Sequence, residues 1–217
     1  MNRDTRTALM DLAEHTVRSR GFDGFSYADL AEAIGIRKAS IHYHFPTKAK
    51  LSEALIERYQ TSLQQGLTEI DAAHASAGAR LKALIALYRG ALHDGQTVCL
   101  CVAFSTCRES LSDTVIARVG AVRAMVLQWI TATFELGQRD GSVSAILGPA
   151  DEAQATLAML EGAHLAARTE EDLAVFDAVT TGQESRFERA IKFVFAHVAT
   201  FPVSFGRCLP VHNRYAN

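Results

Sequence analysis

The segment IRKASIHYHFPTK, residues 36–48, concentrates three basic side chains and two histidines, although the whole chain has a formal net charge of −2. Ammonium, guanidinium and imidazole groups donate hydrogen bonds to phosphates and to the edges of bases. Because this positive charge is local rather than global, we interpret it as a surface for a local polyanion such as a DNA groove. A basic face on an ordinary surface helix is the competing interpretation.

These side chains must be positioned by helices, and capping signals predict the first of them. In SYADLAEAIG, Ser26 can cap the first amides of a helix and Asp29 completes a capping box. Gly35 then ends this helix early, because glycine tolerates the left-handed conformation of a helix end.

A second short helix, residues 37–44, is expected to end before Pro46, and Thr47 can cap a longer helix after it. A further helix is predicted over residues 4–20. This order fits a helix-turn-helix whose second helix could enter the major groove of DNA.

Short polar and basic side chains suit a helix that faces a groove. Arg37 and Lys38 can donate to phosphate or guanine, and Ser40 can bond a base edge or a phosphate. Thr47 and Lys48 stand at a predicted helix N-terminus, where backbone amides and an ammonium group can hold a phosphate together.

Residues 5–58 resemble the DNA-binding head of the TetR family of bacterial transcriptional repressors. The resemblance rests on GFDGFS, on ADLAEAIG and on HYHFPTKAKL. Two positions depart from the family pattern, since His42 stands where Tyr is usual and Ala39 where Gly is frequent. Base contacts therefore do not transfer residue by residue.

The resemblance implies a double-stranded operator DNA as partner and assigns roles to individual side chains. Tyr43, His44 and Lys48 would mainly hold phosphates, although His44 beside Phe45 is also compatible with packing in the head. Candidates for reading bases are Arg37, Lys38, Ser40 and His42. The full predicted DNA-binding set is Ser26, Tyr27, Arg37, Lys38, Ser40, His42, Tyr43, His44, Thr47 and Lys48.

Helical periodicity with only four prolines predicts an all-α chain. We expect a three-helix helix-turn-helix DNA-binding domain over residues 1–47, a larger helical effector-binding and dimerisation domain over 48–200, and an irregular tail over 201–217. The long helices of the larger domain are predicted at 77–94, 99–110, 112–138, 150–168 and 184–198, with a loop of at most one helical turn at EEDLAVFDAVTTGQ.

The last two predicted helices carry apolar stripes, including Leu157, Leu160 and Ala163 on the first and Phe187 and Ile191 on the second. By the family resemblance, which LEGAHLAAR extends, these helices would form a four-helix bundle with a second copy. We therefore expect a homodimer, with a monomer core as the other explanation of the stripes.

Three cysteines lie close together in TVCLCVAFSTC. Cys99, at a predicted loop-to-helix boundary, would have a lowered thiol pKa and an exposed thiolate, as in family members that sense oxidants or electrophiles. Cys101 or Cys107 is the possible resolving partner. Alternatively, the cysteines only fill the core and the inducer binds noncovalently.

The expected pocket for a small-molecule inducer lies in the larger domain and contains aromatic and polar side chains. The candidate lining residues are Tyr88, Phe104, Met125, Trp129, Phe134 and His164. Each of them is also compatible with ordinary core packing.

Other classes of protein find little support. The cysteine spacing fits no zinc site, and we expect no metal or cofactor. A hydrolase using Cys99 with His93 or His164 remains a remote alternative, without an elbow motif, a phosphate loop or HExxH. Charges interrupt the apolar runs near the N-terminus and no stretch reaches about 18 apolar residues, so we expect a cytoplasmic protein without membrane contact.

Overall fold

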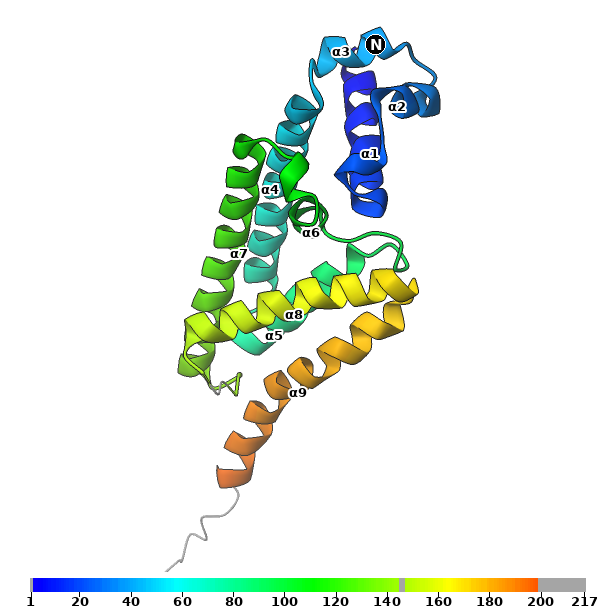
Figure 1. Ribbon diagram of the computed structural model, residues 1–217. Coiled ribbons are helices and arrows are strands. Elements are labelled where there is room, and N and C mark those ends of the chain that lie inside the picture. Colours follow the sequence, from blue (N-terminus) through cyan, green and yellow to red (C-terminus); the bar gives the residue numbers. More distant parts are fainter. Residues whose placement is uncertain (1, 145–146, 199–217) are drawn as a thin grey trace, which may run out of the picture.

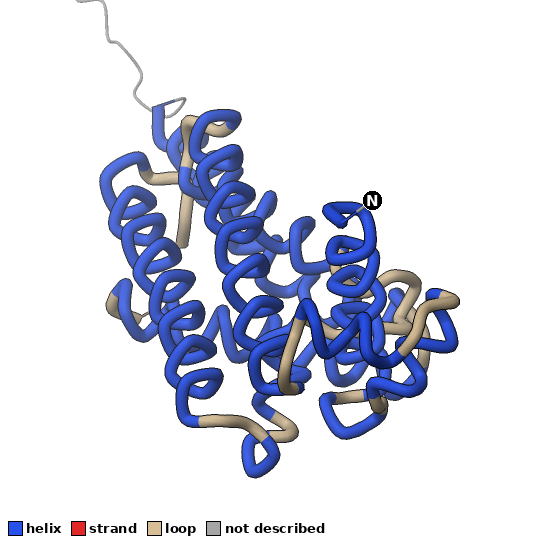
Figure 2. Tube along the Cα trace, turned by 90° about the horizontal axis from the view of Figure 1, so that it is seen from above, coloured by secondary structure: helices blue, strands red, loops and turns tan. Residues whose placement is uncertain are grey.

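The structure, a computed structural model, describes the backbone of residues 2–144 and 147–198 and the side chains of residues 5–144 and 147–187. The predicted tail, residues 201–217, lies outside the described residues. Within the described part every regular element is a helix, as Figure 2 shows, and the all-α prediction is confirmed.

Four helices build the head. They are α1 (Asn2–Arg20), the short 3-10 helix η1 (Phe22–Gly24), α2 (Tyr27–Ile34) and α3 (Lys38–His44), shown in blue at the top of Figure 1. Local signals set these bounds as predicted. Ser26 and Asp29 form a reciprocal capping box, and Gly35 ends α2 with a φ of +73°.

The body contains the remaining elements: α4 (Lys48–Ala73), α5 (Ala77–Gly90), α6 (Leu100–Ser105), η2 (Arg108–Ser110), α7 (Asp113–Asp140), α8 (Pro149–Glu170) and α9 (Leu173–Val198). Thr47 caps α4 as predicted. Helix α4 belongs to both regions, because Leu51 and Leu55 are buried beside the head and Leu67 is buried farther down. The predicted division at residues 47 and 48 therefore stays a prediction.

Helix α7 packs against α4, α5, α6 and α8, and α8 packs along α9 (Figure 1). By length and composition alone, α7 is the one helix in the described part of the chain that is long and apolar enough to cross a membrane. Single helices of this kind also occur in the bodies of soluble helical proteins.

The predicted loop over residues 170–183 is wrong, because α9 already begins at Leu173. Phe176 is fully buried, and the buried hydroxyl of Thr180 donates to the Phe176 carbonyl at 3.0 Å. Burial of this face outweighs the weak helix propensity of the Asp, Thr and Gly residues. The predicted helix over 99–110 is also wrong in extent, since α6 ends at Ser105 and η2 follows.

Candidate functional site

The exposed side of the head is formed by α3 and by the N-termini of α2 and α4. Ile41 is fully buried and anchors α3, while Arg37, Lys38, His42 and Tyr43 are exposed. Tyr43, with 75% of its surface accessible, is the most exposed large apolar side chain among the described residues. The alternation of one buried and several exposed positions makes α3 a helix with a free outer face.

Two open grooves flank α3, and together they contain all ten residues of the predicted DNA-binding set. The first groove is lined by Thr5, Ile36, Arg37, Ala39, Ser40, Tyr43 and His44. The second is lined by Phe25, Ser26, Tyr27, Lys38, His42, Thr47 and Lys48. Residues from the ends of three helices thus gather around one short helix.

His42 is exposed, and one of its ring nitrogens has a backbone partner. Its Nδ1 lies 3.2 Å from the Pro46 carbonyl oxygen, and its ring is 5.0 Å from that of Tyr27. A carbonyl only accepts hydrogen bonds, so Nδ1 carries the proton and Nε2 of the neutral ring remains an acceptor. A base amino group is the partner that such an acceptor can bind.

Ser26 and Tyr27 are placed differently from groove-facing contacts. The Ser26 hydroxyl accepts from the amides of Ala28 and Asp29. Tyr27 is buried, its hydroxyl donates to the Phe45 carbonyl at 3.0 Å, and burial raises its pKa to about 12. Tyr27 therefore forms a buried part of the groove wall, whereas Ser26 is exposed at the N-terminus of α2.

The Lys48 ammonium also departs from the predicted phosphate contact, because it points into the head. Its Nζ donates to the carbonyls of Phe22 and Phe25 at 2.6 and 2.7 Å, and lies 4.4 and 4.1 Å from the centroids of their rings. Desolvation by this burial lowers its pKa. The chain between α1 and α2 offers two carbonyls without helical partners, and Lys48 satisfies both.

Besides the bonds made by α4, three sets of hydrogen bonds join the head to the body. Arg18 donates from Nε to the Val98 carbonyl at 2.9 Å and from Nη2 to the Ala91 carbonyl at 2.5 Å, and its own carbonyl accepts from the Val98 amide. Arg168 of α8 donates to the Ser19 carbonyl at 3.2 Å. A third bond joins the Ser110 hydroxyl to Asp23 at 2.7 Å.

The prediction of an exposed Cys99 thiolate is wrong. Cys99 is the N-cap of α6 as expected, and its Sγ accepts from the Val102 amide, but only 2% of its surface is accessible. Burial raises the pKa of Cys99 to about 11 and that of Cys101 well above its usual value. Desolvation outweighs the helix N-terminus here. Of the described cysteines, Cys107 alone is half-buried.

The body contains a small cavity of about 10 Å³. Three members of the predicted ligand and sensor set line it, namely Tyr88, Cys99 and Cys101, and Phe104 lines a separate pocket between α6 and α7. The hydroxyls of Tyr59 and Tyr88 form no hydrogen bond among the described residues. Tyr59, Arg123 and Glu161 also line the cavity, although the sequence did not predict them there, and Arg123 and Glu161 form an ion pair.

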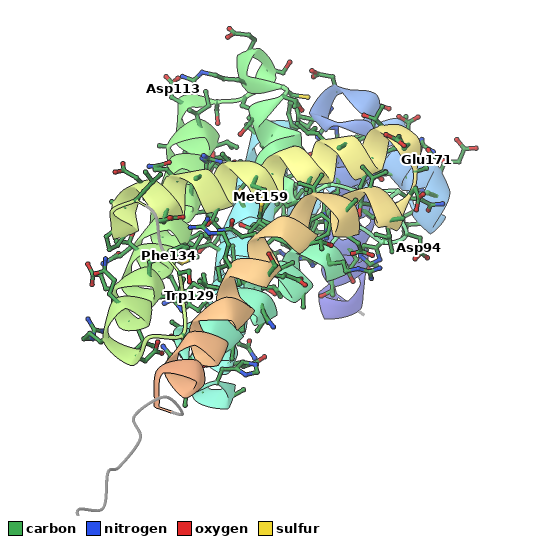
Figure 3. All side chains as sticks on the ribbon, turned by 90° about the horizontal axis from the view of Figure 1, so that it is seen from below. Asp94, Asp113, Trp129, Phe134, Met159 and Glu171 are labelled. Carbon is green, nitrogen blue, oxygen red and sulfur yellow. The ribbon has the colours of Figure 1, made fainter. Side chains whose placement is uncertain are left out.

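Four predicted pocket residues do not line any of the described pockets: Met125, Trp129, Phe134 and His164. Trp129 donates from Nε1 to Asp71 at 3.0 Å, and Phe134 is fully buried core. Figure 3 shows both on the half of α7 that lies away from Asp113. A charged residue next to the buried stripe of α7 could have indicated the cavity, because Arg123 directly follows the buried Val122.

His164 is fully buried and bonded on both nitrogens. Nδ1 accepts from the Cys99 amide at 3.0 Å, and Nε2 lies 2.9 Å from the Tyr88 carbonyl, which only accepts. Desolvation by burial lowers the pKa of His164 to about 4. The neutral ring therefore ties α8 to α5 and to the start of α6.

Comparisons with known proteins agree with this architecture. Residues 9–55 match the family described as bacterial regulatory proteins, tetR family. The chain is 25% identical over 170 residues to the HTH-type transcriptional repressor NemR of Escherichia coli strain K12, covering 76% of this chain and 84% of the relative.

Two solved structures share the fold. A TetR-family transcriptional regulator from Agrobacterium tumefaciens has a TM-score of 0.82 and 28% identity, over 87% of this chain and all of that one. The reduced form of E. coli NemR has a TM-score of 0.70 and 23% identity, over 82% and 94% of the two chains.

Proposed function

We propose that this chain, which belongs to the TetR family of bacterial transcriptional regulators, represses transcription as a cytoplasmic homodimer bound to a near-palindromic operator. It is a DNA-binding regulator and not an enzyme. The observation that carries the proposal is the gathering of the ten predicted residues in the two grooves beside α3.

Contacts with DNA divide by chemistry. Arg37, Lys38, Ser40 and the free Nε2 of His42 are proposed to read base edges in the major groove. Tyr43, His44 and the N-terminus of α4 after Thr47 are proposed to hold phosphates, which position the helix without reading sequence. The Lys48 side chain is left out of this set, because it serves the head itself.

The dimer is proposed to form through α8 and α9. Leu165 on α8 and Val179 on α9 leave 45% and 42% of their surfaces exposed, which suits an apolar face covered by a second copy. Two heads related by a two-fold axis would then reach successive major grooves about 34–36 Å apart.

An inducer in the body is proposed to shift the dimer toward a state in which the heads no longer match the operator. Tyr59 and Tyr88 line the small cavity of the body, and their hydroxyls are available to hydrogen-bond a ligand that widens it. Movement of the chain from Ala91 to Cys99 would reach the head directly, because Arg18 is bonded to both ends of it.

Substitution of Lys38 by alanine tests the operator contact. We expect operator affinity to fall about tenfold, since one charged groove contact is worth about 1–3 kcal/mol. Fluorescence anisotropy on DNA from upstream of the protein's own gene, at several salt concentrations, would measure it together with the number of protomers bound.

Lys82→Ala, which removes the same charge from α5 in the body, is the matched control and should bind as the unaltered protein does. Equal affinities of the Lys38 and Lys82 variants would contradict the assignment of α3. One protomer per operator would contradict the dimer.

Release by thiol modification is a second candidate mechanism, and Cys107 supports it better than Cys99. Its Sγ lies 3.4 Å from the place where a Cβ on Gly21 would stand. An adduct on this half-buried sulfur would separate the end of α1 from the body. We expect N-ethylmaleimide to release DNA from the Cys99→Ser variant but not from Cys107→Ser. Release from Cys107→Ser would end the idea.

A further inference from the structure

We propose that a second effector site lies between α6, η2 and α7 and binds a small amphipathic carboxylate. The pocket has a volume of about 250 Å³ and adjoins the small cavity of the body at Arg123, which lines both. Four apolar side chains, Phe104, Leu111, Ile116 and Val119, and two guanidinium groups, Arg108 and Arg123, line it.

The apolar part of the pocket suits a short hydrocarbon chain or ring. Phe104 is fully buried and Val119 nearly so, whereas Leu111 and Ile116 are half-buried at the opening. Covering such surface is favourable by about 25 cal/mol per Å² of apolar area removed from water. The pocket alone would therefore accept many apolar molecules.

The charged residues at the pocket favour an anionic ligand. Arg108 is exposed, and its guanidinium forms no hydrogen bond or ion pair with any residue that the structure describes. Arg123 is paired with Glu161 of α8, and no acidic residue lines the pocket. A guanidinium group binds a carboxylate through two parallel hydrogen bonds, so an anionic head group is the complement of this opening.

The pocket touches the head through the segment that contains Arg108. The Ser110 hydroxyl donates to Asp23, and Cys107 lies against Gly21. In Figure 1 this part of the chain lies between α6 and the start of α7, on the side of the body nearest the head. A carboxylate held by Arg108 would draw η2 toward the pocket and away from Asp23.

Arg123 offers a second route of coupling. A carboxylate that competes for its guanidinium would leave Glu161, whose side chain is 16% exposed, with an unpaired charge on α8. An unpaired carboxylate at such a position is costly, so α8 would have to adjust. This regulatory part rests on the proposed function, whereas binding of the carboxylate does not.

Gly120 allows the site to be closed without disturbing the fold. It lines the pocket from an exposed position on α7, and a Cβ added there meets nothing within 4 Å. Leucine also has a higher helix propensity than glycine. Gly90, exposed near the end of α5 and equally free of neighbours, gives the matched control.

Calorimetric titration of the full chain without DNA, with sodium octanoate as probe and octanol and octylammonium for comparison, tests binding. We expect octanoate to bind in the submillimolar range, and Arg108→Gln and Gly120→Leu each to weaken it about tenfold, with Gly90→Leu unchanged. Octanol and octylammonium should bind at least about tenfold more weakly. The proposed site is wrong if octanoate does not bind, if it binds Gly120→Leu as tightly as the unaltered protein, or if it binds no more tightly than octanol.

Operator release tests the regulatory part separately. Octanoate should release DNA from the unaltered protein and from Gly90→Leu but not from Gly120→Leu. If octanoate binds but does not release DNA, the proposed regulation is wrong and the proposed binding site stands. If the unaltered protein does not bind its operator before octanoate is added, the result counts against the proposed function instead.

Discussion

Replacing Lys48 with alanine is expected to lower the free energy of unfolding by about 3 kcal/mol. The ammonium donates to the Phe22 and Phe25 carbonyls at 2.6 and 2.7 Å and lies over both rings. A hydrogen bond from a charged group contributes about 1.5–3 kcal/mol, and removing the donor leaves two carbonyls unsatisfied. Urea denaturation followed by circular dichroism would measure the loss.

Lys50→Ala provides the control, because Lys50 is exposed and its ammonium pairs with Glu53 three residues on, the one ion pair it forms within the described part of the chain. Its effect should stay within about 0.5 kcal/mol. The same two variants separate the structural role of Lys48 from a phosphate contact. Lys48 would be assigned to a phosphate contact if Lys48→Ala were as stable as the unaltered protein and the slope of log operator affinity against log salt concentration fell in magnitude by about one.

Acidification is expected to destabilise the protein through His164. Burial lowers the pKa of its imidazole to about 4, against 6.5 in the unfolded chain. Between these values the unfolded chain binds a proton that the folded chain does not, so the contribution is complete above pH 6.5 and is lost as the pH falls toward 4. The loss over this window is about 3 kcal/mol.

The structural consequence of protonation follows from the hydrogen bonds. A protonated Nδ1 cannot accept from the Cys99 amide, which would leave that amide buried without a partner. The Arg18 guanidinium would also repel the charged ring, which disfavours protonation further. Acid should therefore loosen the start of α6 first.

Denaturation curves between pH 7 and pH 4.5 measure this effect. His164→Gln keeps a neutral donor and acceptor, so its free energy of unfolding should be lower at pH 7 but should vary less with pH. His15→Gln, at an exposed position of α1, should keep the full dependence. A pH dependence that is equal in all three proteins would assign it to other groups.

The sequence by itself determined the head, because its signals are local. Ser26 with Asp29, Gly35 and Thr47 act on backbone groups within a few residues, and the structure has each of these caps. Helical periodicity likewise predicted the all-α class, and α1, α7 and α8 lie within a few residues of their predicted bounds. The grooves beside α3 gather the residues that the helix-turn-helix pattern and the family resemblance had grouped.

Only the tertiary structure decided the direction and burial of single side chains. Lys48 stands at a helix N-terminus in the sequence, but the carbonyls that hold it come from residues more than twenty positions earlier. Cys99 sits at a helix start that would activate an exposed thiol, yet the body buries it, and desolvation is the larger effect. Burial against distant helices also made residues 173–183 helical and paired Arg123 with Glu161, because these contacts depend on how the helices pack.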